Sequence, residues 1–279
     1  MTEYLQWLEA ALLGVLQGLT EFLPVSSSAH LRLTGELLPS ATDPGAAFTA
    51  ITQLGTEAAV LLYFRKDILR IAAAWLRSPA GRHGEDAADV RLGWLVLIGT
   101  LPIAILGLAF KEAIEGSLRN LYITASMLIG FGIILGLADR FGRQSRQLEG
   151  MRWRDGILLG FAQAMALIPG VSRSGGTISA GLLLGYSREA AARYSFLLAI
   201  PAVLASGFYQ LVRHWGDFGP FGFGQTALAT LISFAVGYGV IVLFLKIIST
   251  RSFMPFVWYR VLLGSLMLSL LAFGLIDPV

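Results

Sequence analysis

The sequence contains no cysteine and has few charged residues. Charged residues make up 14% of the 279 positions and hydrophobic residues 55%, whereas a soluble domain is about one quarter charged. Without cysteine the chain has no disulfide, no thiolate metal site and no cysteine nucleophile. The shortage of charge and the mean hydropathy of +0.68 indicate a protein of the lipid bilayer, and we expect no nucleic-acid partner.

Long apolar runs predict six membrane spans. A helix of about 20 mainly apolar residues crosses the ~30 Å hydrocarbon layer. The candidate spans are residues 46–64, 92–110, 121–138, 194–212, 225–245 and 256–276. The 32 glycines suit the close helix packing that is typical of membrane bundles.

Two further apolar stretches, 14–31 and 160–177, are broken by a proline followed by serines and glycines or alanine. They match each other at a constant offset of 146, including a shared glutamine and a shared Val-Ser-x-Ser, which indicates an internal repeat. Irregular backbone at membrane depth is tolerated only where protein buries it or where it faces a wet cavity. We therefore interpret each stretch as a re-entrant hairpin rather than as an ordinary span.

The predicted fold is an all-α polytopic membrane protein with six transmembrane helices and two re-entrant helix–loop–helix hairpins. Residues 1–279 form one integral membrane domain. The first repeat is 1–140, with its hairpin at 5–34, and the second is 150–279, with its hairpin at 154–186. Each hairpin is followed by three spans, and because three is odd the second repeat is inverted relative to the first. The simpler alternative is eight ordinary spans.

Basic residues predict the orientation. The predicted inner loops 65–91, 139–154, 188–193 and 246–260 hold 16 of the 21 Lys and Arg residues. The positive-inside rule then leaves both termini outside. In this topology the first hairpin opens outward, the second opens inward, and their tips meet near the middle of the membrane.

The first hairpin carries a carboxylate, hydroxyls and a histidine. Gln17 and Glu21 are four residues apart and share a helix face. After Pro24, three serines stand where the next helix should begin, and His30 follows in its first turn. A helix N-terminus with hydroxyl side chains favours an anion.

The second hairpin contains Pro-Gly-Val-Ser-Arg-Ser-Gly-Gly-Thr at 169–177. Here Arg173 lies among hydroxyls and glycines at the start of a helix, and a guanidinium with exposed backbone N–H groups suits a phosphate. Structural alternatives remain open for both hairpins. Glu21 could simply pair with Arg173, His30 could be a packing residue, and the serines could serve only as helix caps.

These two motifs resemble a known family. Gln17-x-x-x-Glu21, continuing as Phe-Leu-Pro-Val-Ser-Ser-Ser-Ala-His to position 30, resembles the first signature of the bacterial undecaprenyl-diphosphatases, the bacitracin-resistance phosphatases. The motif at 169–177 is similar to the second signature. The likeness covers essentially the whole chain and extends to Gln53-Leu54-Gly55 and to the Tyr259-Arg260 pair.

The resemblance implies roles for particular residues. Catalytic roles fall on Glu21, Ser27, His30 and Arg173, and contacts with the substrate on Ser26, Gln53, Gly170, Ser172, Ser174 and Thr177. It also implies a divalent cation, Mg²⁺ or Ca²⁺, at Glu21 and Gln17. The family admits Glu or Gln at the latter position, and an uncharged carboxamide weakens a metal role there.

The implied activity is hydrolysis of a polyprenyl (undecaprenyl) diphosphate to the monophosphate at the outer face of the bacterial inner membrane. This reaction would recycle the lipid carrier of cell-wall synthesis and confer bacitracin resistance. For the nucleophile we favour Ser27 before Ser26, with Glu21 or His30 as the base, and attack by an activated water is the second route. A homodimer is a further expectation. The sequence leaves the lipid chain length and the choice of cation open.

Two other classes of protein share parts of this pattern. Inverted repeats with broken helices are also transporter architecture, so a lipid-phosphate flippase or anion carrier is the alternative. Type-2 phosphatidic acid phosphatases place a histidine after five residues beyond a Ser-Arg pair, whereas here Ser172-Arg173 is followed at that spacing by Ser179. That family is therefore excluded.

Overall fold

The computed structural model describes residues 3–38, 44–78 and 86–278. Throughout these ranges the regular structure is helical, with no β-strand. The helices are α1 Glu3–Thr20, α2 Ser27–Leu37, α3 Gly45–Tyr63, α4 Arg65–Arg77, α5 Ala87–Ala109, α6 Lys111–Glu115, α7 Leu121–Phe141, α8 Trp153–Ala164, α9 Arg173–Leu183, α10 Arg188–Arg213, α11 Phe223–Ile248 and α12 Met254–Ala272, with the 3-10 turns η2 Ser117–Arg119, η3 Leu148–Gly150 and η4 Met165–Leu167.

Six of the described helices are long and apolar enough to cross a membrane, as predicted. These are α3, α5, α7, α10, α11 and α12, of 19 to 26 residues each. Two begin several residues before their predicted runs, α5 at Ala87 and α10 at Arg188, because both helices continue into polar sequence. The predicted inner loop 65–91 contains a further helix, α4, while its residues 79–85 lie outside the described ranges.

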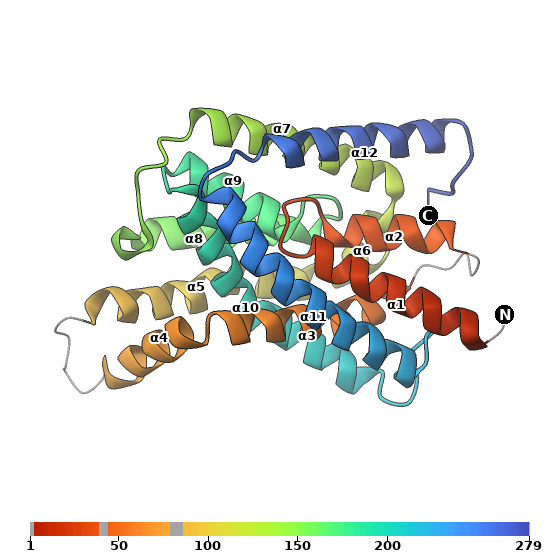
Figure 1. Ribbon diagram of the computed structural model, residues 1–279, viewed down its shortest axis with the longest axis horizontal. Coiled ribbons are helices and arrows are strands. Elements are labelled where there is room, and N and C mark those ends of the chain that lie inside the picture. The colour runs from red at the N-terminus through yellow and green to blue at the C-terminus, as the bar shows by residue number, and fades with distance from the viewer. Residues whose placement is uncertain (1–2, 39–43, 79–85, 279) are drawn as a thin grey trace.

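The two broken apolar stretches form helix–turn–helix units, with breaks at 21–26 and 165–172. Helices α2 and α9 have 11 residues each, or about 16 Å at 1.5 Å per residue, too short to cross a ~30 Å layer. In Figure 1 the α1–α2 unit lies in the right half, beside the two chain ends, and α8 and α9 lie in the left half.

Each helix–turn–helix unit packs on a long helix of the other half of the chain, α1 against α11 and α8 against α5. Glycines allow these contacts. A Cβ added to Gly14 would lie 2.6 Å from the Ala229 carbonyl oxygen, and one added to Gly160 would lie 2.5 Å from the Gly99 carbonyl oxygen. Small residues at such crossings let two backbones approach closely, so the two units are held in equivalent ways.

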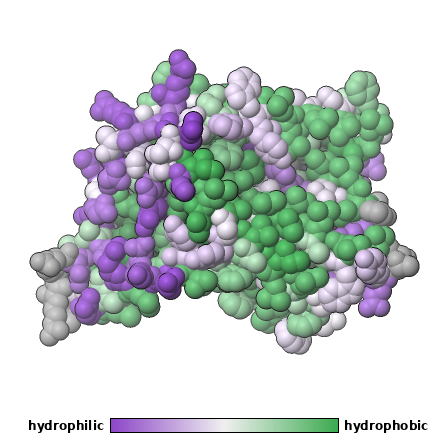
Figure 2. All heavy atoms as spheres, in the orientation of Figure 1, coloured by the Kyte–Doolittle hydropathy of each residue, from purple (hydrophilic) through white to green (hydrophobic). Residues whose placement is uncertain are grey.

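Polar side chains gather at one end of the molecule. In Figure 2 the hydrophilic residues lie mainly at the left end, and hydrophobic residues cover most of the remaining face. Ion pairs at the polar end join segments of the predicted inner loops, such as Arg188 Nε with Asp139 Oδ1 at 2.6 Å. Large apolar side chains on the long helices, for example Leu231 and Leu262, are about two-thirds exposed, as suits contact with lipid.

Candidate active site

The first turn places a carboxylate beside a serine hydroxyl. Helix α1 ends at Thr20, and α2 begins at Ser27 after a turn that contains Glu21. Glu21 Oε2 accepts hydrogen bonds from Gln17 Nε2 and from Ser27 Oγ, both at 2.7 Å. Gln17 and Glu21 therefore lie side by side, as predicted, and Ser27 of α2 contacts the same carboxylate. A hydroxyl that donates to a carboxylate is the arrangement of a nucleophile with its base.

The second turn shares one unusual backbone feature with the first. Ser26 and Ser172, one before each short helix, have positive φ values of 71° and 72°, which is unusual for a residue with a side chain. Ser172 Oγ accepts a hydrogen bond from the Gly175 N–H at 3.1 Å and so caps α9. Gly170 has φ +93°, and a Cβ there would lie 2.2 Å from the Thr124 carbonyl oxygen, so only glycine fits.

The two turns meet and are joined by an ion pair. Arg173 Nη2 contacts Glu21 Oε1, and Ser174 Oγ donates to the Leu23 carbonyl oxygen at 3.1 Å. The ion pair between Glu21 and Arg173, which the sequence allowed as a purely structural role for these residues, is therefore formed. This ion pair does not exclude a chemical role for Arg173, because its side chain keeps 17% of its surface exposed and lines a cavity.

This cavity has a volume of about 600 Å³. The polar residues at the two turns and on α3 are Glu21, Ser26, Ser27, Ser28, Gln53, Ser172 and Arg173. The walls are mainly apolar side chains of α5 and α10, with Thr100, Ser206 and Gln210 among them. Lys111 and Tyr209 also line the cavity, with Lys111 Nζ 5.6 Å from the centre of the Tyr209 ring. Lys111 is the first residue of α6, directly after α5, and Tyr209 lies near the end of α10. A cavity with polar residues at one end and apolar side chains along its sides suits an anionic head group that carries an apolar chain.

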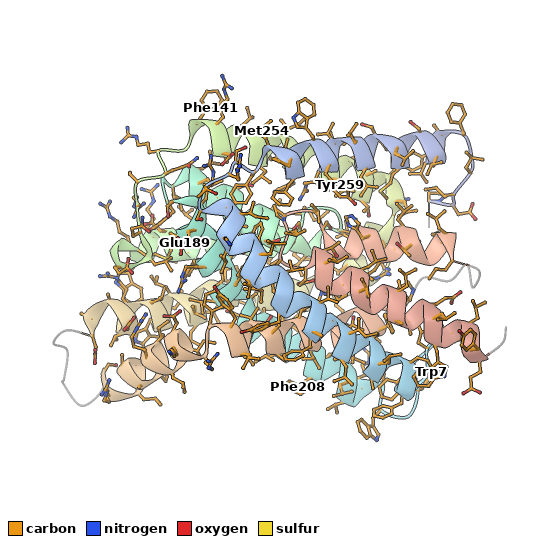
Figure 3. The ribbon with its side chains drawn as sticks, in the orientation of Figure 1. Trp7, Phe141, Glu189, Phe208, Met254 and Tyr259 are labelled. Atoms are coloured by element: carbon orange, nitrogen blue, oxygen red, sulfur yellow. The ribbon has the colours of Figure 1, made fainter. Side chains whose placement is uncertain are left out.

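His30 lies apart from the cavity lining. Its Nδ1 is 2.8 Å from the Ser26 carbonyl oxygen, and its Nε2 is 2.6 Å from Tyr259 Oη. A carbonyl oxygen can only accept, so Nδ1 carries the proton and Nε2 accepts from the tyrosine. Figure 3 shows Tyr259 on α12, on the side toward α2. Both ring nitrogens are therefore engaged in holding the first turn.

Other predicted site residues are also buried and do not line the cavity. Thr177 is buried and its Oγ1 donates to the Arg173 carbonyl oxygen at 2.7 Å. Gln17, Gly170, Ser174 and Thr177 are absent from the lining, whereas Gln53 is part of it. Sequence reasoning missed Lys111 and Tyr209, which carry no motif and become neighbours only when α10 packs on α5, the helix directly before Lys111.

A metal centre built from side chains alone is not found in the described ranges, where no three His, Asp or Glu residues cluster as metal ligands. Two candidate ligand atoms nevertheless adjoin the first turn, a carboxylate oxygen of Glu21 and Gln17 Oε1. The latter is buried and has no hydrogen-bond partner in the described structure. Mg²⁺ is commonly bound by one or two carboxylates together with phosphates of the substrate. The residues therefore fit a partial site that a diphosphate would complete.

A bundle with six candidate spans encloses two helix N-termini, a guanidinium and a serine–carboxylate pair around one cavity. These features define a polytopic membrane protein with a site for an anionic group. The chain belongs to the family described as bacitracin resistance protein BacA, which residues 10–266 match. The family membership predicted from the two motifs is thereby confirmed.

Curated relatives match almost the full chain. A protein of Agrobacterium fabrum named undecaprenyl-diphosphatase 2 is 70% identical over 271 residues, covering 97% of this chain and 98% of the relative. Undecaprenyl-diphosphatases of Paenarthrobacter aurescens and Micrococcus luteus are 62% and 58% identical, covering 98% and 97% of this chain and 100% and 99% of their own lengths. The names are those of phosphatases and not of transporters.

Proposed function

We propose that this chain hydrolyses undecaprenyl diphosphate to undecaprenyl phosphate and inorganic phosphate. The observation that carries the proposal is the contact of Ser27, Glu21 and Arg173 within one cavity, in a chain so similar to proteins of that name. By converting the lipid diphosphate to the monophosphate the enzyme would recycle the lipid carrier, and bacitracin resistance is the expected phenotype of its activity.

The diphosphate would be bound by positive charge and by backbone N–H groups. Arg173 lines the cavity beside Ser172, whose hydroxyl already caps the Gly175 N–H. The remaining N–H groups in the first turns of α2 and α9 have no carbonyl partner within a helix. Together with the guanidinium they would neutralise the charge that develops on the transferred and leaving phosphates.

Ser27 is the proposed nucleophile and Glu21 its base. The 2.7 Å hydrogen bond from Ser27 Oγ to Glu21 Oε2 lets the carboxylate take the hydroxyl proton. Ser27 Oγ would bond to the terminal phosphorus as the P–O bond to undecaprenyl phosphate breaks, which leaves a phosphoserine. Water would then hydrolyse the phosphoserine and release inorganic phosphate. Since both ring nitrogens of His30 are engaged, Glu21 is favoured over His30 as the base.

Direct attack by water is the second route. In that case Glu21 would remove a proton from the water, and Ser27 would donate a hydrogen bond to the terminal phosphate. A divalent cation, Mg²⁺ or Ca²⁺, held by Glu21, Gln17 and the substrate phosphates, would supply further charge neutralisation in either route.

The arrangement of re-entrant hairpins in an inverted repeat is also part of the proposal. Support comes from features related by the offset of 146. Ser26 and Ser172 share the same unusual φ, and each contacts the serine two residues on, Oγ to Oγ, at 3.2 and 3.1 Å. The packing of α1 on α11 and of α8 on α5 is related in the same way.

We place the cavity on the outer side of the membrane. It reaches Lys111 and Tyr209, at the helix ends remote from the basic inner loops, which supports this orientation. The cysteine-free chain makes a test simple. Ser117→Cys and Ser145→Cys each change one exposed serine, and an impermeant thiol reagent applied to intact cells should label the first and spare the second. The reverse pattern would overturn the orientation.

A homodimer completes the proposal. Apolar side chains such as Leu231 and Leu262 stay exposed on the bundle, and a second copy could cover such a surface as acyl chains do. The mass of the protein in lipid nanodiscs measures this directly, and a monomer at all protein concentrations would contradict it.

The decisive experiment is phosphate release by the purified protein in detergent, where the two sides of a membrane no longer exist. Undecaprenyl diphosphate should yield stoichiometric inorganic phosphate, and a chelator should lower the rate. A protein that binds the lipid but releases no phosphate, with or without added Mg²⁺ or Ca²⁺, would refute the enzyme assignment. A flippase would give that second result.

A further inference from the structure

Arg260 of α12 is a buried cation that the proposed reaction does not use. Its side chain is 0% exposed, and it is the largest fully buried side chain among the described residues. No carboxylate forms an ion pair with it in the described part of the chain. A charge so deep in a membrane protein is costly to bury, so its partners must hold it firmly.

The partners of Arg260 are carbonyl oxygens of both turns. Nη1 donates to Pro24 O at 2.9 Å, in the first turn, and Nη2 donates to Gly170 O at 2.8 Å and Val171 O at 3.0 Å, in the second. The remaining bonds run to α7, from Nε to Leu128 O at 3.1 Å and from Nη2 to Met127 O at 3.3 Å. One guanidinium thus ties together the two turns and a neighbouring helix.

These bonds fix the direction of peptide groups next to the unusual serines. In a trans peptide the C=O and the following N–H point in opposite directions. Because the Val171 carbonyl points at Arg260, the Ser172 N–H points away from it. Ser172 lines the cavity and Arg260 does not. The guanidinium therefore holds the second turn from behind, and its bond to Pro24 O restrains the first turn in the same way.

We propose that Arg260 is a positioning residue that keeps both phosphate-binding turns in register, so that the Ser172 N–H and Arg173 face the same phosphate as Ser27. This inference rests on the proposed function and deepens it. Lysine cannot replace arginine here, because one ammonium group cannot span carbonyls of two turns and α7. The surroundings also fit arginine closely, since a Cβ on Gly175 would lie 2.8 Å from Arg260 Nη1.

The test uses Arg260→Lys together with two glycine variants of the same helix, α9. Gly175→Ala would push on Arg260 Nη1 at 2.8 Å and also on Ser172 Cβ at 3.1 Å, whereas Gly181→Ala would meet Ala191 Cβ at 2.8 Å and is the matched control. We expect Arg260→Lys and Gly175→Ala each to lower kcat at least tenfold with KM within threefold of the wild type. Gly181→Ala should lose as much melting temperature as Gly175→Ala but keep kcat within threefold.

Equal loss of kcat in the two glycine variants, or full activity in Gly175→Ala, would overturn the inference. If Arg260→Lys does not fold, amide exchange at the first turn in Gly175→Ala decides, because Arg260 is hydrogen-bonded to Pro24 O of that turn. Hydrogen–deuterium exchange gives a readout that does not depend on activity. Exchange should rise at residues 23–26 and 169–172 together in Gly175→Ala but not in Gly181→Ala. Wild-type protein that releases no phosphate would refute the proposed function, and exchange at the two turns would then decide the positioning role.

Discussion

The two turns share an unusual serine conformation and carry opposite chemistry. Positions 27 and 173 are equivalent at the offset of 146, yet one is the serine that donates to Glu21 and the other is the arginine that pairs with it. Glu21 itself corresponds to Leu167, which lies in the apolar wall of the same cavity. In the proposed mechanism a repeated scaffold would supply two similar helix N-termini, while the unlike side chains at positions 27 and 173 would provide the nucleophile and the anion-binding cation.

The largest expected effect comes from the serine side of this comparison. Ser27→Ala should lower kcat by at least about a thousandfold, because a covalent route loses its nucleophile. Lipid diphosphate binding should be retained. Single-turnover kinetics, with a search for acid-stable phosphoserine on quenched wild-type enzyme, measures this.

If kcat of the Ser27→Ala variant is within tenfold of the wild-type value, the covalent route is refuted and direct attack by water is favoured. Glu21→Gln separates the two cases further. It keeps the shape but removes the charge, so it should be nearly inactive in both routes, as a base and a metal ligand are both lost.

The arginine side should show the next largest effect. Arg173→Ala removes a charge-assisted contact, and we expect a loss of about a hundredfold or more in kcat/KM with little change in melting temperature. Arg213→Ala is the control, since Arg213 is exposed, contacts the hydroxyl of Tyr209 at 3.5 Å and does not line the cavity. Near-normal turnover of Arg173→Ala would show that the second turn does not bind the phosphate.

His30 has no counterpart in the second turn, where Gly176 occupies the equivalent position. Its contacts with Ser26 and Tyr259 indicate that it supports the turn, so His30→Gln should lower kcat about tenfold, less than the 10²–10⁴-fold typical of a general acid or base. Tyr259→Phe should also lower kcat, but by a smaller factor than His30→Gln. A loss above a hundredfold in His30→Gln, with the pH dependence of kcat altered, would restore the catalytic role that the sequence suggested.

The smallest effect is expected at Thr177, which the sequence analysis assigned to substrate binding. Its hydroxyl donates to the Arg173 carbonyl oxygen within its own helix, so Thr177→Val should keep kcat and KM within about threefold and change stability by about 1 kcal/mol. Steady-state kinetics and a thermal melt measure both. A large rise in KM would mean that this hydroxyl reaches the substrate after all.

The sequence predicted the six long helices because each contains an apolar run that few other structures could explain. It also predicted both helix breaks, from a proline followed closely by serines and small residues. Proline alone is not sufficient, since Pro102 and Pro201 lie inside α5 and α10. The contact between Glu21 and Arg173 was foreseen as one alternative, from the expectation that the two tips converge. The roles of the site residues stay predictions until the variants are measured.

Other features could not be found from sequence. Arg260 was noted only as part of a family resemblance, because its five carbonyl partners come from three distant segments and carbonyl groups have no sequence signature. The engagement of both His30 nitrogens depends on Tyr259, 229 residues away. Lys111 and Tyr209 meet only through helix packing.

The size of the cavity has a consequence for how the enzyme should be measured. A volume of about 600 Å³ is that of a site for a drug-sized molecule, so it can hold a diphosphate and the first part of a polyprenyl chain but not the whole chain. The rest of the chain must stay among the surrounding acyl chains during turnover. Substrate and product would then exchange in two dimensions, so the rate should follow the mole fraction of the lipid in the bilayer or micelle and fall on surface dilution at constant bulk concentration.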